Sequence, residues 1–244
     1  MFVFDPLIYL YTIVMGTLSL LSSLIDEDGQ IQHWFAKAWS WLILKTSLCP
    51  VEIVGQQKLL CKGACVYAVN HISAFDIPTL YTQLPQFRIM AKKELFRYPF
   101  LGWHLRRSGQ LPIDQQNPGS SIRSLKRSID TLRSGMPLVI FPEGGRSPNG
   151  QIQPFMSGAF YIAIKAKVDI IPMALVGTYE ILPMNTYHIR PRPIQLLVGE
   201  PIPTSGYGLR DMDALCQRVQ QAVEDLYYKH SHVPDPRRAA VSGA

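Results

Sequence analysis

Hydrophobic and polar residues follow two different patterns along the chain. Residues 1–48 contain long apolar segments with few charges, whereas the sequence after Pro50 alternates short apolar runs with amphipathic stretches. Short buried strands that alternate with helices are typical of an α/β fold, in which helices flank a mixed, largely parallel sheet. We therefore predict an α/β domain over 49–230, preceded by two membrane-associated helices over 1–48 and followed by a disordered polar tail over 231–244.

The first apolar run covers residues 7–25, which include no charged side chain. A helix rises about 1.5 Å per residue, so this run extends roughly 28 Å, close to the thickness of a bilayer's hydrocarbon core. Acidic residues flank it on both sides, which is not typical of a secretory signal peptide. We prefer a helix that spans or enters a membrane, and a helix buried in the protein core is the alternative.

A second helix is expected over 33–45, where three of the four tryptophans occur within eight residues. Tryptophan favours the headgroup region of a membrane, because its ring is buried there while its N–H stays hydrated. His33, Lys37 and Ser40 form a narrow polar stripe on this otherwise apolar segment. The segment therefore indicates an interfacial helix, and a helix docked on the main domain is the alternative.

Five apolar runs after Pro50 predict buried strands, at 65–69, 87–91, 137–141, 170–177 and 193–199. Helices are expected between them, at 119–135, at 158–166, at 212–226 and from Asp76 onward. The helix at 119–135 is strongly amphipathic, with Ser120 or Ser121 as its N-cap and Gly135 after its last turn.

Composition narrows the class of protein and of partner. The 244 residues carry 24 Lys and Arg against 18 Asp and Glu, for a formal net charge of +6, and 47% of them are hydrophobic. These values exclude an intrinsically disordered chain and a coiled coil. Between residues 88 and 133, ten basic residues stand against three acidic ones. Such a local positive charge indicates an anionic partner, which is a membrane surface, a phosphorylated substrate or nucleic acid.

The four cysteines include no CxxC pair and have no histidines clustered beside them. This pattern gives no zinc site. We expect neither a structural metal nor a cofactor.

The first candidate for chemistry is the segment Asn70-His71-Ile72-Ser73-Ala74-Phe75-Asp76, which follows a predicted strand. If His71 lies in the loop and Asp76 begins the helix, the carboxylate can orient the imidazole and leave its other nitrogen to accept a proton. The alternative is that Asp76 only caps the helix, with Pro78 in the first turn.

The second candidate is Pro142-Glu143-Gly144-Gly145-Arg146-Ser147, which follows another predicted strand. A strand that ends in a Gly-Gly turn exposes backbone N–H groups, and the Arg146 guanidinium there can bind a phosphate with two hydrogen bonds. The alternative is an ordinary turn with a surface salt bridge.

With Lys93-Glu94-Leu95 and Asp114 between these segments and Pro172 after them, the order of blocks resembles the 1-acyl-sn-glycerol-3-phosphate acyltransferases of phospholipid synthesis. The resemblance covers about 35–205. It implies a membrane-bound enzyme that transfers an acyl group from acyl-CoA or acyl-carrier protein to the sn-2 hydroxyl of 1-acylglycerol-3-phosphate, giving phosphatidic acid. It also implies a site on the cytoplasmic face of the inner membrane, a lyso-phospholipid acceptor, membrane lipid as a partner, and no nucleic acid. The catalytic pair falls on His71 and Asp76. The substrate-binding residues fall on Lys93, Glu143, Gly144, Gly145, Arg146, Ser147 and, for the acyl donor, Pro172.

Departures from the family pattern bear on the acceptor. Gln115 stands where the family usually has Arg, Gly145 stands where it usually has Thr, and the segment 154–158 lacks the usual lysine. Two basic groups near the acceptor phosphate are therefore missing. Acylation of another lyso-lipid, such as lyso-ornithine lipid, is an alternative, and so is a non-catalytic membrane protein that binds lipid.

Overall fold

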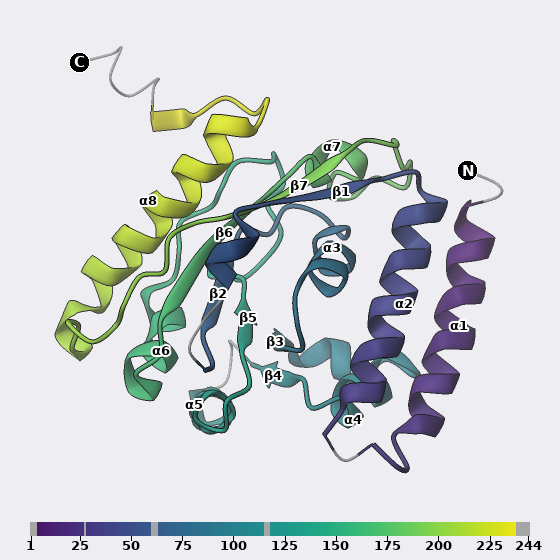
Figure 1. Cartoon of the computed structure of the whole chain (residues 1–244), viewed down its shortest axis with the longest axis horizontal. Helices are drawn as coiled ribbons and strands as arrows, with labels where there is room; N and C mark the ends of the chain where they lie inside the picture. Colours follow the sequence, from purple (N-terminus) through teal and green to yellow (C-terminus); the bar gives the residue numbers. More distant parts are fainter. Residues whose placement is uncertain (1–3, 27, 60–62, 115–117, 238–244) are drawn as a thin grey trace.

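The computed structural model describes residues 4–26, 28–59, 63–114 and 118–237, and its centre is a seven-stranded sheet with helices on both faces (Figure 1). The strand order is β1-β7-β6-β2-β5-β3-β4. The strands are β1 Val51–Val54, β2 Val66–Val69, β3 Arg88–Lys92, β4 Leu111–Ile113, β5 Leu138–Ile140, β6 Ile170–Val176 and β7 Ile194–Val198.

All neighbouring strands pair in parallel except β6 and β7, which are antiparallel. Five strands, from β6 to β4 in the order of the sheet, therefore run in the same direction. Their carboxyl ends meet at one edge, where the loops that follow β2, β5 and β3 lie side by side. The prediction of a mixed, largely parallel sheet is confirmed.

Helices cover each face of the sheet because alternate residues of each strand point to opposite sides. In β6, Ile170 and Ala174 pack on the side of α5, α6 and α8, whereas Ile171 and Met173 pack on the side of α2 and α3. The helices are α1 Phe4–Ser22, α2 Gln30–Thr46, α3 Asp76–Gln83, α4 Leu101–Arg107, α5 Pro118–Arg133, α6 Tyr161–Ala166, α7 Thr178–Ile181 and α8 Met212–His230. Short 3-10 turns are η1 Gln56–Leu59, η2 Lys93–Arg97, η3 Ser157–Phe160 and η4 Leu209–Asp211.

The five predicted strands and four predicted helices of the domain are all present, with shifts of a few residues at their ends. The prediction of Ser120 or Ser121 as an N-cap is wrong, because α5 already begins at Pro118 and both serines lie inside the helix. Proline is well suited to that place, since the first turn of a helix does not need its N–H.

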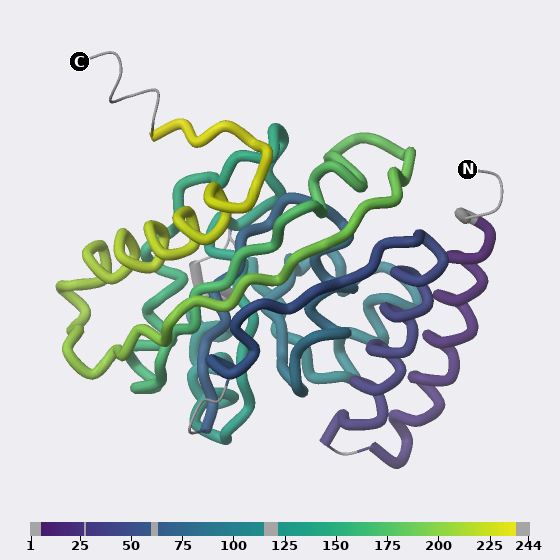
Figure 2. The backbone as a smooth tube through the Cα atoms, turned by 45° about the horizontal axis from the view of Figure 1, so that its top comes forward, coloured from purple at the N-terminus to yellow at the C-terminus, as the bar shows by residue number. Residues whose placement is uncertain are grey.

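α1 and α2 form an antiparallel pair at one end of the molecule, with α2 next to the sheet domain and α1 outside it (Figures 1 and 2). The Trp39 indole N–H donates to the Thr12 hydroxyl at 3.0 Å, which joins the two helices. Arg88 of β3 holds the connection between them, because its guanidinium donates to the Asp28 carbonyl at 2.8 Å. In the described parts of the chain, no helix combines the length and apolarity needed to cross a membrane. The helix expected over 7–25 is thus present, without support for its spanning form.

The chain after α8 folds back along that helix as far as the structure describes it. Arg237 forms ion pairs with Asp225, at 2.8 Å, and with Asp235, at 2.9 Å, and its guanidinium lies over the Tyr228 ring. Residues 231–237 of the expected tail therefore have defined contacts.

Candidate active site

His71 and Asp76 lie together at the carboxyl end of β2. The imidazole Nδ1 is 2.8 Å from the Asp76 Oδ2 atom, with the carboxylate fully buried and the ring partly exposed. Because the carboxylate only accepts hydrogen bonds, this contact fixes the proton on Nδ1 and leaves the Nε2 lone pair available to accept a proton. The pair can therefore act as an oriented general base.

Backbone N–H groups hold the Asp76 carboxylate in place. Ile72 and Ser73 each donate to Oδ2 at 2.8 Å, so that oxygen accepts three hydrogen bonds. These donors precede Asp76 in the chain, and the side chain makes no capping bond to the first turn of α3. The helix-cap alternative for Asp76 is therefore wrong.

Glu143, at the carboxyl end of the neighbouring strand β5, fixes the backbone of the His71 loop. Its Oε1 atom accepts the His71 N–H at 2.6 Å, and its Oε2 atom accepts the Gln153 N–H at 2.8 Å. The Ser147 N–H in turn donates to the His71 carbonyl at 2.8 Å. Glu143 and Ser147, predicted as substrate contacts, thus join the two loops and position the histidine.

Burial raises the pKa of the Glu143 carboxyl to about 8, although the N–H groups of Gln153 and His71 oppose this shift. The Asp76 carboxylate nearby raises the pKa further. We therefore expect Glu143 to change protonation near pH 8, next to the backbone of the His71 loop.

The Glu-Gly-Gly-Arg turn lies beside the histidine ring. The His71 imidazole stacks on Phe141, with ring centroids 4.0 Å apart. Gly144 has φ +74° and donates its N–H to the Phe141 carbonyl at 3.0 Å, a tight turn that disfavours residues with a Cβ atom. Arg146 follows on the exposed side, and its guanidinium makes no hydrogen bond or ion pair with any described residue. The turn therefore presents a free cation beside the loop that carries His71.

The structure brings Lys92 to this turn, a residue that the sequence analysis missed. The Lys92 Nζ atom lies 3.8 Å from the place where a side chain at Gly145 would begin. Lys93, which we predicted instead, points to the Asp114 carboxylate and donates to it at 3.0 Å. Lys92 is the last residue of β3, whereas Lys93 begins η2, so the chain changes direction between the two lysines and their side chains reach different partners. The sequence alone did not show where the strand ends.

Pro172 is a predicted site residue that lies within a strand of the sheet, whereas the two catalytic candidates lie at the end of one. It is buried within β6 and pairs in register with Ala68 of β2, before the strand end that carries His71. Its role toward the acyl donor stays a prediction. Gln115 lies outside the described residues. No group of three or more possible metal ligands occurs in the part of the chain that the structure describes.

Side chains of α8 hold the loop after β5 through hydrogen bonds. The Tyr227 hydroxyl donates to the Gly150 carbonyl at 2.7 Å, and the Tyr228 hydroxyl accepts the Ile152 N–H at 3.1 Å. The Gln220 side chain accepts the Phe155 N–H at 3.0 Å. The last helix therefore fixes the loop that carries Glu143 and Arg146.

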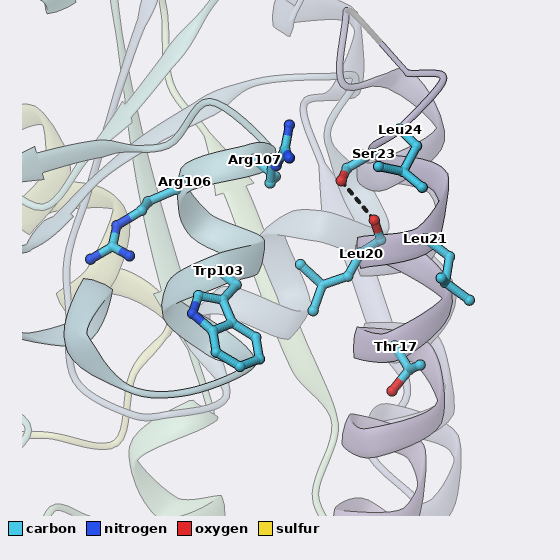
Figure 3. A pocket seen from close by; sticks show the side chains of 8 residues that line it. All are labelled: Thr17, Leu20, Leu21, Ser23, Leu24, Trp103, Arg106 and Arg107. Atoms are coloured by element: carbon cyan, nitrogen blue, oxygen red, sulfur yellow. Dashed lines mark hydrogen bonds between the residues drawn. The ribbon is translucent and has the colours of Figure 1, made fainter.

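A separate groove of about 470 Å³ lies between α1 and α4 (Figure 3). The Leu20 side chain points from α1 toward α4, where Trp103 forms part of the opposite wall. Arg106 and Arg107 lie at its margin. The groove is thus apolar with a cationic edge.

The chain is similar to known acyltransferases over most of its length. The sequence profile of the acyltransferase family matches residues 50–176. A chloroplastic 1-acyl-sn-glycerol-3-phosphate acyltransferase of Brassica napus is 31% identical over 201 residues, which are 80% of this chain and 56% of the relative. The enzyme of the same name from Helicobacter pylori is 33% identical over 175 residues, or 70% of this chain and 71% of the relative.

The solved structure of the 1-acyl-sn-glycerophosphate acyltransferase PlsC from Thermotoga maritima has the same fold, with a TM-score of 0.74 and 22% identity. The alignment covers 90% of this chain and 93% of that one. The chain therefore belongs to the acyltransferase family, and within that family to the 1-acyl-sn-glycerol-3-phosphate acyltransferases. It spans little more than half the length of the chloroplastic relatives that it matches.

Proposed function

We propose that this protein transfers a fatty acyl group from a thioester donor to the sn-2 hydroxyl of 1-acylglycerol-3-phosphate, giving phosphatidic acid. The observation that carries the proposal is the contact of 2.8 Å between the His71 imidazole and the buried Asp76 carboxylate, next to a turn with two cationic side chains. Relatives from Brassica napus and Helicobacter pylori are named 1-acyl-sn-glycerol-3-phosphate acyltransferases, which supports this acceptor.

The His71 Nε2 atom takes the proton from the acceptor hydroxyl as its oxygen attacks the thioester carbonyl. The imidazolium that forms is stabilised by the Asp76 carboxylate. The attack forms the new C–O bond, and collapse of the tetrahedral intermediate restores the C=O bond and breaks the C–S bond. The imidazolium then gives its proton to the leaving thiolate, so the histidine returns to its neutral state.

Arg146 and Lys92 supply the positive charge for the acceptor phosphate. Arg146 is exposed beside the turn, and Lys92 reaches Gly145 from the neighbouring strand β3. Guanidinium groups bind phosphate with two parallel hydrogen bonds, whereas an ammonium group acts as a point charge. Lys92 thus replaces part of the basic charge that the departures at Gln115 and at 154–158 remove.

The N-terminal helix pair is proposed to attach the enzyme to the membrane. The active site would then lie at the cytoplasmic face of that membrane. Large apolar side chains of this pair and of the turn that follows α1 are exposed, among them Leu24 in that turn, 75% exposed, and Trp34 in α2, 60% exposed. Exposed apolar surface of this extent marks an interaction site with lipid or protein. The donor is acyl-CoA or acyl-carrier protein.

The proposal is tested with purified protein, an acyl-CoA and a panel of lyso-lipids that includes 1-acylglycerol-3-phosphate and lyso-ornithine lipid. Mass spectrometry of the products identifies the acceptor. His71→Ala should lower kcat about 10²–10⁴-fold, the usual contribution of a positioned general base. His230→Ala, at the exposed end of α8, is the matched control and should keep full activity. A His71→Ala enzyme within a few-fold of the wild type would refute the mechanism, and acylation of lyso-ornithine lipid alone would refute the acceptor.

A further inference from the structure

A second concave region, of about 430 Å³, lies beside the edge of the sheet formed by β3 and β4. Four basic side chains line it, from η2, α4 and α5, together with Phe96, Gln110 and Pro112. We call it the basic pocket, defined by Lys93, Arg97, Arg106 and Arg127.

The charge of the basic pocket is largely uncompensated by the protein. Lys93 is paired with Asp114 at 3.0 Å. Within the described ranges, Arg97, Arg106 and Arg127 form no ion pair and no side-chain hydrogen bond. Three guanidinium groups converge from three different elements, although like charges that approach each other are unfavourable. Such an arrangement is stabilised when an anion with several negative charges binds between them.

The basic pocket lies within reach of the catalytic histidine. β2, β5, β3 and β4 are consecutive in the sheet, so β3 is two strand spacings from β2, or about 10 Å, and β4 is about 14 Å away. Lys93 directly follows Lys92, whose amine touches the turn next to His71. A ligand that reacts at His71 can therefore place a charged end in the basic pocket if the arm between its two ends is longer than about 14 Å.

We propose that the basic pocket binds the diphosphate and 3′-phosphate groups of coenzyme A while the donor's thioester lies at His71. The proposal rests on the function proposed above and specifies the donor. Coenzyme A has this form: its thiol end is joined by the pantetheine arm to a nucleotide with three phosphate groups. Arginine suits such groups because its fixed donors match phosphate oxygens.

The shape of the pocket favours a small polyanion over a carrier protein. Its volume lies within the range of small-molecule sites, and its basic residues surround a concavity rather than forming a flat patch. The groove between α1 and α4 is a different environment, because its walls are mainly apolar. Figure 3 shows the Arg106 side chain extending away from α1, in agreement with its place in the basic pocket.

The test is calorimetric titration of the full chain with coenzyme A, with coenzyme A lacking the 3′-phosphate, and with pantetheine. Arg127→Gln and Arg106→Gln should each weaken coenzyme A binding about tenfold, near the lower end of the value for a charge-assisted hydrogen bond. Lys126→Gln is the matched control, because it removes the same charge from the adjacent, exposed position of α5. The control should bind as the wild type does, and pantetheine should bind equally to all variants.

Each result has one meaning. Equal loss in Lys126→Gln and Arg127→Gln would overturn the pocket in favour of general surface attraction. Wild-type affinity for coenzyme A in both arginine variants would also overturn the proposed role of the basic pocket. So would a protein that uses only acyl-carrier protein and does not bind coenzyme A. In both cases the proposed acyl transfer would still stand. His71→Ala separates the two proposals, because it should lose turnover and still bind coenzyme A with the wild-type affinity. Thermal melting of each variant shows that the exposed arginines were replaced without unfolding.

Discussion

Apolar side chains take opposite positions in the sheet domain and in the N-terminal helix pair. All seven residues of β6 are buried, as expected for a central strand with helices on both faces. In α1, by contrast, Ile13, Leu18 and Leu21 are exposed, and Leu21 is 59% exposed. The sheet domain buries its apolar side chains, as a protein in water does. The helix pair instead exposes apolar side chains on its outer surface.

α2 shows the same inversion at the level of single residues. Gln32 and Ser40 are buried against the domain, and their side chains have no hydrogen-bond partner among the described residues. Trp34 and Trp41 are more than half exposed on the other side. A buried unpaired polar group is unfavourable, and so is an apolar ring in water. This distribution fits a helix that lies between the domain on its polar side and lipid on its tryptophan side, which supports the proposed attachment to the membrane.

The largest effect should come from Asp76→Asn, which changes the domain and leaves the helix pair untouched. Asparagine has no charge to stabilise the imidazolium, so kcat should fall about 10²–10⁴-fold. Binding to lipid vesicles should stay as in the wild type. Steady-state kinetics and vesicle sedimentation check the two parts.

Asp130→Asn serves as the control, since Asp130 is exposed on α5. It should leave both measurements unchanged. Loss of vesicle binding in Asp76→Asn would show that site and attachment are coupled, and the two regions could then not be treated as separate.

The second prediction changes apolar side chains at the end of α1 and leaves the sheet domain as it is. Leu21→Ser with Leu24→Ser replaces two exposed apolar side chains. Burial of a leucine contributes about 1.5–3 kcal/mol, so partitioning into vesicles should weaken roughly 100-fold or more. The thermal midpoint in solution should not fall, because neither side chain is part of the core.

Ile122→Ser with Leu209→Ser is the matched control, because both residues are exposed apolar side chains of the domain. That pair should not alter partitioning. If it weakens partitioning as much as the α1 pair does, the membrane contacts the domain and the helix pair is not the attachment.

Sequence patterns were reliable where one physical requirement dominated. The buried strands and α5 followed from apolar periodicity, and the His71–Asp76 pair followed from a loop between a strand and a helix. β4 was not predicted because three residues are too few for a periodic signal, and α4, with seven residues, was not predicted either. The polar stripe of α2 was visible, but it gave no indication that Ser40 is buried in the interface with the domain.

Contacts between distant segments limited the prediction of the site. The Glu143 side chain holds the His71 backbone, 72 positions earlier in the chain, and nothing near Glu143 in sequence specifies that bond. The choice between Lys92 and Lys93 depends on where β3 ends, because Lys92 is its last residue and Lys93 begins η2. Both features depend on how strands and turns are arranged in the folded chain.

The third prediction concerns the pH dependence of the domain. In the folded state burial raises the pKa of Glu143 to about 8, above its usual value of 4.5. The folded protein then binds more protons than the unfolded chain between these values, so the contribution of Glu143 to stability is complete below about 4.5 and is lost as the pH rises toward 8. The free energy of unfolding of the wild type relative to Glu143→Gln should fall over this window. Urea titrations from pH 5 to about pH 9 check it, and a relative increase would show that the two N–H donors keep the carboxylate ionised.

The smallest effect compares two buried serines, one from each region. Ser128 in α5 donates its hydroxyl to the Ser124 carbonyl at 2.9 Å, whereas the Ser40 hydroxyl in α2 has no partner in the described parts of the chain. Ser128→Ala removes a hydrogen bond and should lower the free energy of unfolding by about 0.5–1.5 kcal/mol. Ser40→Ala removes an unpaired polar group and should leave the free energy of unfolding unchanged or raise it by about 1 kcal/mol. Because both serines lie within helices and change to the same residue, the difference in helix propensity cancels. If Ser40→Ala lowers the free energy of unfolding as much as Ser128→Ala does, the Ser40 hydroxyl has a hydrogen-bond partner in solution. The exposed tryptophans would then be the main evidence that α2 faces lipid.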